Sequence, residues 1–295
     1  MQLDSPTSTQ DLLAADTSMG AVSLRVADLD AMTAYYRDAV TLTLLSQQSD
    51  RSVLGRGRTP IVILEHAPEL RHAGPREAGL FHTAILFETE ADLAAAVYSV
   101  ASRDPHTFTG SADHLVSKAF YFNDPEGNGI ELYWDRDRTQ WSWSHGRVQM
   151  ASLQLDPNAF LQQHLAEDAL TLPHTRPATV GHVHLSVGDI PSARKFYVDQ
   201  LGFETTSEFG SQALFVSAGK YHHHMAMNTW NSAGAGRRRL ALGLGLVRIE
   251  LPTADDLGAL DERLSHHGIG TRDHGNVLDF DDPWLNRVEI TVRSS

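Results

Sequence analysis

The chain of 295 residues repeats itself, and this internal symmetry limits the folds that it can adopt. The segment "MGAVSLRVADLDAMTAYYRDAVTL" (residues 19–42) aligns with "VGHVHLSVGDIPSARKFYVDQLGF" (residues 180–203). Farther along, "DHLVSKAFYFNDPEGNGIELYW" (113–134) resembles "DHGNVLDFDDPWLNRVEITV" (273–292). Repetition at this spacing predicts two homologous halves of ordinary domain size. The alignment pairs Gly20 with Gly181, Tyr36 with Tyr197, His114 with His274, Asn128 with Asn286 and Glu131 with Glu289.

Each half contains the same pattern twice. Residues 180–187 alternate apolar and polar side chains as a strand does, and Asp189 then stands where a helix N-cap is expected. Apolar residues follow at helical spacing until Gly202, a common helix stop. Short β-rich runs come next, and a second strand and helix end at Gly268. The pattern predicts an α+β protein with four units of strand, helix and several strands.

The predicted boundaries follow from the repeat. We expect one domain over residues 19–148, a Pro- and polar-rich linker over 149–178, and a second domain over 179–295. Neither end nor middle carries an apolar run of about 18 residues, and the first 18 residues lack the basic start of an export signal. We therefore expect a cytoplasmic protein without a membrane partner.

The composition of the chain limits its binding partners and the kinds of metal site that it can form. The formal net charge of −13 disfavours binding to nucleic acid or to anionic lipid. The chain contains no cysteine, so thiolate metal sites and cysteine nucleophiles are excluded. A metal site must therefore consist of histidine and carboxylate side chains.

Three phrases carry a resemblance to a known family: "GHVHLSVGDIPSARKFYVDQLGF", "DPEGNGIELYW" and "YHHHMAMNTWNSAGA". They resemble the vicinal oxygen chelate superfamily of glyoxalases, bleomycin resistance proteins and extradiol dioxygenases, and most of all its two-domain, catechol 2,3-dioxygenase-like members. The resemblance implies four βαβββ modules that pair into two glyoxalase-like domains with cupped, metal-holding sheets. It also implies that the amino-terminal domain is the non-catalytic one.

The resemblance implies a metal site in the second half. His182 falls at one ligand position and Glu289 at the carboxylate position, but Leu246 stands where a second histidine is usual. The triplet His222–His224 lies on an expected strand, so either its middle or its two outer residues face the cup. We favour His223 as a ligand, with His222 and His224 binding substrate. A two-His-one-carboxylate set suits Fe(II), while Mn, Ni or Zn are alternatives.

A rival site lies in the first half. His82 and Glu131 occupy the second-histidine and carboxylate positions, but Ala21 stands where His182 has its counterpart. Glu65 or His66 would be the third ligand there. For acid–base catalysis the resemblance suggests His274 and, on the strand of His182, His184. The resemblance also implies a tyrosine a few residues after His274. Asp279 stands near that place instead, whereas Tyr121 occupies the comparable place in the first half.

Three functions follow from these residues. The first is an Fe(II)-dependent extradiol dioxygenase that cleaves a small catecholic aromatic with O2. The second is a glyoxalase-like, metal-dependent lyase or isomerase. The third is a binding or resistance protein that holds a small aromatic compound without turnover. Pairing of open sheet edges makes a homodimer conceivable.

Overall fold

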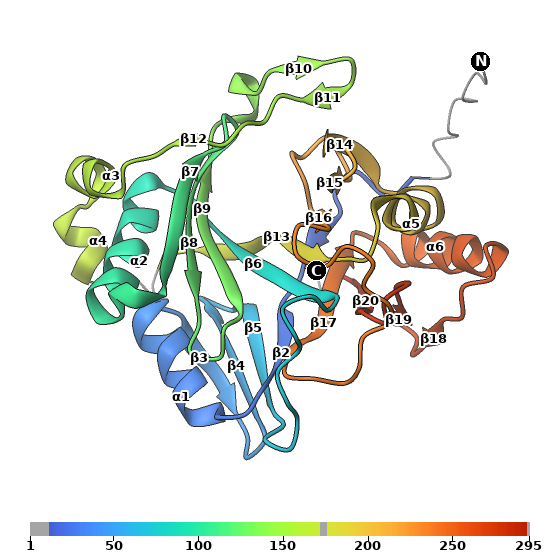
Figure 1. Ribbon diagram of the computed structural model, residues 1–295, viewed down its shortest axis with the longest axis horizontal. Helices are drawn as coiled ribbons and strands as arrows, with labels where there is room; N and C mark the ends of the chain where they lie inside the picture. The colour runs from blue at the N-terminus through green and yellow to red at the C-terminus, as the bar shows by residue number, and fades with distance from the viewer. Residues whose placement is uncertain (1–11, 172–175, 294–295) are drawn as a thin grey trace.

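The computed structural model describes residues 12–171 and 176–293. Residues 1–11, 172–175 and 294–295 lie outside this description, including a part of the predicted linker. The described chain contains four consecutive βαβββ modules, and a longer segment with its own short elements joins the second module to the third (Figure 1). The predicted α+β class and the four modules are confirmed.

The first two modules have the following elements. Module 1 comprises β2 (Val22–Val26), α1 (Leu29–Ala34) with the π-helical turn η2 (Tyr35–Ala39), β3 (Thr43–Gln47), β4 (Arg51–Arg56) and β5 (Thr59–His66). Module 2 comprises β6 (Gly79–Phe87), α2 (Glu90–Arg103), the turn η3 (Pro105–Thr107), β7 (Phe108–Asp113), β8 (Ser117–Asn123) and β9 (Gly129–Asp135).

The last two modules repeat this order. Module 3 comprises β13 (Ala178–Ser186), α5 (Ile190–Arg194) with η6 (Lys195–Gln200), β14 (Glu204–Phe209), β15 (Ala213–Ser217) and β16 (Met225–Asn228). Module 4 comprises β17 (Gly243–Leu251), α6 (Ala254–His266), β18 (Arg272–Asp273), β19 (Val277–Asp281) and β20 (Arg287–Val292). Outside the modules lie β1 (Ser18–Met19), η4 (Arg138–Gln140), β10 (Trp143–Ser144), β11 (Arg147–Val148), β12 (Leu153–Gln154), α3 (Pro157–His164) and α4 (Glu167–Thr171).

The helix signals read from the sequence have their expected roles. The side chain of Asp189 accepts a hydrogen bond from the backbone N–H of Ser192 and caps α5. Gly202 follows the helix with φ of 95°, and Gly268 follows α6 with φ of 72°. Both glycines adopt the left-handed conformation that ends a helix at little cost. Local sequence therefore determines where these helices begin and end.

The two sheets do not follow the two halves of the chain. One sheet has the order β12-β7-β8-β9-β6-β13-β16-β15-β14 and joins modules 2 and 3; we call it the 2/3 sheet. The other has the order β18-β19-β20-β17-β2-β5-β4-β3 and joins modules 4 and 1; we call it the 4/1 sheet (Figure 1). The division at residues 149–178 remains a prediction, but each sheet takes strands from both halves.

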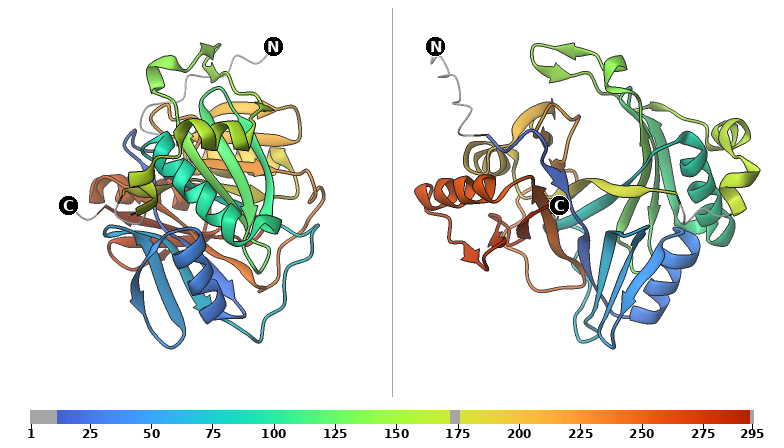
Figure 2. Two further views of the ribbon diagram at one scale, coloured as in Figure 1. Left: turned by 90° about the vertical axis from the view of Figure 1, so that its left-hand side faces the viewer. Right: turned by 180° about the vertical axis from the view of Figure 1, so that it is seen from behind.

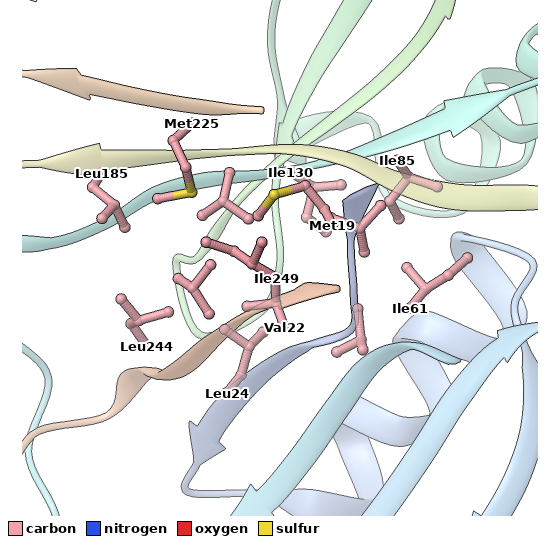
Figure 3. Close-up of a cluster of buried hydrophobic side chains, with 14 of the residues drawn as sticks. Met19, Val22, Leu24, Ile61, Ile85, Ile130, Leu185, Met225, Leu244 and Ile249 are labelled. Carbon is pink, nitrogen blue, oxygen red and sulfur yellow. The ribbon is translucent and has the colours of Figure 1, made fainter. Parts of the chain in front are cut away.

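The main core lies between the two sheets. Figure 3 shows apolar side chains from both sheets meeting there, with no polar group among the labelled residues. Each fully buried side chain of this kind contributes about 1.5–3 kcal/mol relative to exposure. Because these residues occupy one face of each strand, the opposite, concave faces remain available for polar side chains. The labelled residues are Met19, Val22, Leu24, Ile61, Ile85, Ile130, Leu185, Met225, Leu244 and Ile249.

One hydrogen bond from a tyrosine to an aspartate connects the two sheets in each half of the chain, and the two bonds match. The Tyr36 hydroxyl, in module 1, donates to the Asp124 carboxylate in module 2 over 3.0 Å. The Tyr197 hydroxyl, in module 3, donates to Asp282 in module 4 over 2.9 Å. Helices α1 and α2 lie together on one side of the molecule, and α5 and α6 lie on the other (Figures 1 and 2). The repeated tyrosine thus has a structural role in both halves.

We expect Tyr36→Phe to lower the free energy of unfolding by about 1–2 kcal/mol, because a buried carboxylate loses a hydrogen-bond donor. Burial raises the pKa of Asp124 to about 6, so urea denaturation at pH 8 measures the carboxylate form. Tyr98→Phe is the control, since the Tyr98 side chain is exposed on α2. Equal stability of the two variants would contradict this account.

Candidate metal centre

Three potential metal ligands converge on the concave face of the 2/3 sheet. His82 comes from β6, Glu131 from β9 and His182 from β13, and all three are buried. Their candidate ligand atoms lie within 4.8 Å of one another. The Nε2 atoms of His82 and His182 are 2.9 and 3.1 Å from Glu131 Oε2. This is a two-His-one-carboxylate set built from both halves of the chain.

Strand register brings these residues together. Glu131 pairs with Ala84 across β9 and β6, and Ala84 pairs with His182 across β6 and β13. His82 lies two residues before Ala84 and therefore projects from the same face. The small side chain of Ala84 leaves the space between Glu131 and His182 open. Gly181 adds a local requirement, because a Cβ there would stand 1.7 Å from the Tyr133 hydroxyl oxygen.

The environment favours the protonation states that bind a metal. Burial opposes ionisation of Glu131, yet its contacts with His182 and His82 hold the pKa of this carboxyl well below its usual range. Burial lowers the pKa of His182 to about 4 even though Glu131 opposes the shift. At neutral pH the group therefore consists of a carboxylate and a neutral His182 imidazole, the ligand forms that a divalent cation requires.

The site also contains polar atoms that the protein leaves unsatisfied. Nε2 of His82 and Nδ1 of His182 are buried and form no hydrogen bond, although His82 Nε2 lies close to the Glu131 carboxylate. A metal held beside Glu131 would complete Nε2 of His82, and the atom that His182 would offer to it is Nε2, which faces the same carboxylate. The residues present fit a divalent metal.

A small cavity of about 80 Å³ lies beside these ligands. His184 lines it from β13, with its ring centroid 4.9 Å from that of His82. Phe215, from β15, contributes an apolar wall. Burial lowers the pKa of His184 well below its usual range, with the nearby His82 and His182 adding to the effect. The expectation that His184 shares a strand face with His182 is met, while its catalytic role stays a prediction.

The three adjacent histidines precede β16, which begins at Met225, and do not lie on the strand expected for them; their surroundings also differ. His223 lines the cavity, and its ring centroid is 4.0 Å from that of His182. His222 is fully buried and contacts His223 and Asp135 rather than the cavity. Nδ1 of His224 accepts a hydrogen bond from the backbone N–H of Ala218. The structure thus favours the middle histidine as the residue facing the cup and gives no support to substrate binding by the outer two.

The structure corrects the predicted ligand set: the converging group is His82, Glu131 and His182, and His223, predicted as a ligand, is not one of its members. Glu289 lies on β20 of the 4/1 sheet, where its Oε1 is 2.6 Å from Nε of Arg248. It belongs to the sheet that lacks His182 and His223, because module 3 pairs with module 2 and not with module 4. The His274 side chain is 61% exposed beside Asp279 in the same 4/1 sheet, so it does not reach the cavity.

Two residues that were not predicted as catalytic line the cavity instead. His114 and Tyr121 stand in module 2, and His114 Nε2 is 2.7 Å from the Tyr121 hydroxyl. The sequence did contain a signal for them, because His114 is the repeat partner of His274 and Tyr121 holds the place where Asp279 interrupts the second half. His82 and Glu131, which the sequence offered as a rival first-half site, belong to the same metal group as His182. Glu65 and His66, the residues considered as the third ligand of that rival site, lie on β5 of the 4/1 sheet instead.

Comparison with known proteins agrees with this arrangement of modules. Residues 18–132 and 179–290 match the sequence model of the Glyoxalase/Bleomycin resistance protein/Dioxygenase superfamily. The chain belongs to this superfamily. Both matched segments contain a first-strand histidine of the metal group, His82 in the first and His182 in the second.

Individual relatives are also similar over nearly the whole chain. A Bacillus subtilis (strain 168) protein named catechol-2,3-dioxygenase is 32% identical over 273 residues, which cover 91% of this chain and 94% of the relative. The structure resembles that of a B. subtilis protein provisionally named a dioxygenase, with a TM-score of 0.64, 14% identity and coverage of 96% and 87%. Glyoxalase I from Zea mays gives a TM-score of 0.56 at 16% identity, with coverage of 94% and 92%. These two structural likenesses concern the fold.

One further expectation from the sequence concerns membrane-spanning segments. Within residues 12–171 and 176–293, no helix has the length and apolar character needed to cross a membrane.

We expect His82→Ala, Glu131→Ala and His182→Ala each to abolish stoichiometric metal binding, because each removes one of three ligands. The measurement is elemental mass spectrometry after anaerobic loading with Fe(II), and wild type should retain about one ion per chain. Glu289→Ala is the matched control, since its carboxylate lies in the other sheet. Loss of iron in the control alone would reject this assignment.

Proposed function

We propose that this protein is an extradiol ring-cleaving dioxygenase that uses O2 and a divalent metal, preferably Fe(II), on a small catecholic aromatic. The observation that carries the proposal is the buried group of His82, Glu131 and His182 beside a cavity. Its support is the 32% identity to a protein named catechol-2,3-dioxygenase. We infer a cytoplasmic location from the sequence, as before.

The ligand group suits this chemistry. His82, Glu131 and His182 would hold a divalent metal, which would supply Lewis acidity toward the oxygens of a diol. Side chains of the cavity orient the aromatic ring of the substrate and accept the proton from its hydroxyl group.

His223 is suited to accept that proton. Nε2 of His222 is 2.9 Å from the Asp135 carboxylate, so this nitrogen carries a hydrogen and donates it. In neutral His222 the other nitrogen, Nδ1, then accepts the hydrogen bond of 2.7 Å from His223 Nδ1. His223 consequently keeps its Nε2 unprotonated. Burial and the neighbouring histidines hold the pKa of His223 well below its usual range, so its ring is neutral at neutral pH and able to accept a proton.

Tyr121 and His114 orient the opposite side of the substrate. His114 Nδ1 lies 2.8 Å from the carbonyl oxygen of Ala151, and because a carbonyl only accepts, this nitrogen is the donor. In the neutral ring, His114 Nε2 therefore accepts the hydrogen bond from the Tyr121 hydroxyl. Burial and the nearby Glu131 raise the pKa of Tyr121 well above its usual value, so the phenol stays protonated. The phenol oxygen remains able to accept a hydrogen bond from a substrate hydroxyl.

The dioxygenase hypothesis predicts consumption of O2 and formation of a yellow ring-cleavage product when the Fe(II)-loaded protein meets catechol. Oxygen-independent turnover with Mn, Ni or Zn would favour the lyase or isomerase alternative. Tight aromatic binding without turnover would favour a binding protein.

We expect His223→Gln to lower kcat by about 10²–10⁴-fold, the usual effect of removing a general base. Asp135→Asn should lower kcat by about 10–100-fold, because it acts through His222. Both variants should keep their iron, and Glu289→Ala should keep full activity as the control. Unchanged kcat in His223→Gln at full iron content would exclude its role as the base.

The cavity lining also predicts which catechols react. Its charged or titratable side chains are Glu131, Tyr121 and histidines, and neither Lys nor Arg is among the described residues that line it. A carboxylate on the ring would be buried without a lysine or arginine partner, which is costly. We expect kcat/KM for catechol or 4-methylcatechol to exceed that for 3,4-dihydroxybenzoate by at least about tenfold, roughly 1.4 kcal/mol. Equal values would contradict this inference.

A further inference from the structure

The concave face of the 4/1 sheet corresponds to the face that holds the metal group in the 2/3 sheet. In the 2/3 sheet, Tyr121, Glu131, Ala84 and His182 follow one another in register. In the 4/1 sheet, Asp279 pairs with Glu289, and Glu289 pairs with Arg248. Arg248 thus replaces Ala84 and neutralises Glu289 through the contact described above. At these positions the concave face of the 4/1 sheet therefore carries an arginine–carboxylate pair in place of the metal group.

A hollow of about 510 Å³ opens at one end of this face. Five arginines and one aspartate line it, in a protein whose formal net charge is −13. The arginines come from β2, β18, β20 and the segment before β17, so tertiary structure gathers them from distant parts of the chain. They are Arg25, Arg238, Arg239, Arg272 and Arg287.

Three of the five have carboxylate partners. Arg272 and Arg287 both contact Asp279, and Arg272 also reaches Asp281. Arg239 is 3.1 Å from Glu77 but 86% exposed, so that ion pair is weak. Most of the positive charge on Arg272 and Arg287 is therefore neutralised within the 4/1 sheet.

Arg25 and Arg238 differ from the others. Each donates to the carbonyl oxygen of Leu244, at 3.2 and 3.1 Å, and Arg238 also donates to Asn286 Oδ1 at 3.1 Å. Neither forms an ion pair with any residue in the described part of the chain. Both guanidinium groups therefore retain N–H donors, since each carries five. Burial is the main cause that lowers the pKa of Arg238, and the nearby positive charge of Arg25 adds to the shift, whereas Asp282 and Glu77 oppose it.

We propose that this hollow binds a small oxyanion with two negative charges, for which inorganic phosphate is the simplest probe, between Arg25 and Arg238. Two guanidinium groups that meet at the Leu244 carbonyl, neither in an ion pair within the described residues, match the paired oxygens of such an anion. Binding would offset their repulsion, and Gly245 in the wall allows close approach to the backbone. The site lies in the sheet opposite the metal group, so it is independent of the dioxygenase proposal.

The test is isothermal titration of metal-free full-length protein with inorganic phosphate at pH 8, against sodium chloride of equal ionic strength. We expect saturable binding of about one phosphate per chain, weakened at least about tenfold by Arg25→Gln and by Arg238→Gln. Arg25→Lys should bind phosphate with intermediate affinity, because lysine keeps the positive charge but lacks the planar pair of N–H donors of the guanidinium group. Thermal denaturation should show a phosphate-dependent rise in Tm for wild type that these Gln variants lose.

Two controls make the outcome decisive. Arg58→Gln removes an exposed arginine in the turn between β4 and β5 and should bind phosphate as wild type does. His182→Ala should also bind normally, since His182 belongs to the other sheet. Absence of saturable binding in wild type, equal weakening by Arg58→Gln, or full binding by a folded Arg25→Gln variant would overturn the proposal.

Discussion

The antiparallel pairing of β6 with β13 is the interaction on which the rest of the site depends. It places His184 opposite His82 and His182 opposite Ala84, so residues about one hundred positions apart share one concave face. Within residues 12–171 and 176–293, neither half contains all three members of the metal group. His182 comes from the second half, whereas His82 and Glu131 come from the first. Backbone hydrogen bonds between modules 2 and 3 complete the set.

The second junction, between β2 and β17, repeats this geometry with different side chains. Duplicated modules provide two equivalent cups, and each cup can then acquire its own chemistry. In one, an alanine between the ligands leaves room for a cation. In the other, Arg248 occupies that position and pairs with Glu289. A single exchange of a small side chain for a long cationic one removes the space and the negative charge that a metal needs.

The polar cups are possible because the apolar faces of the same strands form the core between the sheets. Alternation along a strand separates the two environments. Burial of Glu131 and His182 is costly without partners, and the Tyr36–Asp124 and Tyr197–Asp282 hydrogen bonds help to hold the sheets that enclose them. The unsatisfied Nε2 of His82 is therefore positioned beside Glu131 before any metal binds, which is the preorganisation that binding requires.

The sequence by itself determined the four modules, the helix caps at Asp189 and Gly202, and the chemical types of the metal ligands. These properties depend on residues within one turn or one strand of each other. It also offered His82, Glu131 and His182, but divided them between two incomplete sites. Only tertiary structure decided that module 3 pairs with module 2, which removed Glu289 and His274 from the candidate centre and brought His114 and Tyr121 to it. Strand pairing between homologous modules has nearly the same local pattern in either arrangement, so side-chain packing across the whole core selects the partner.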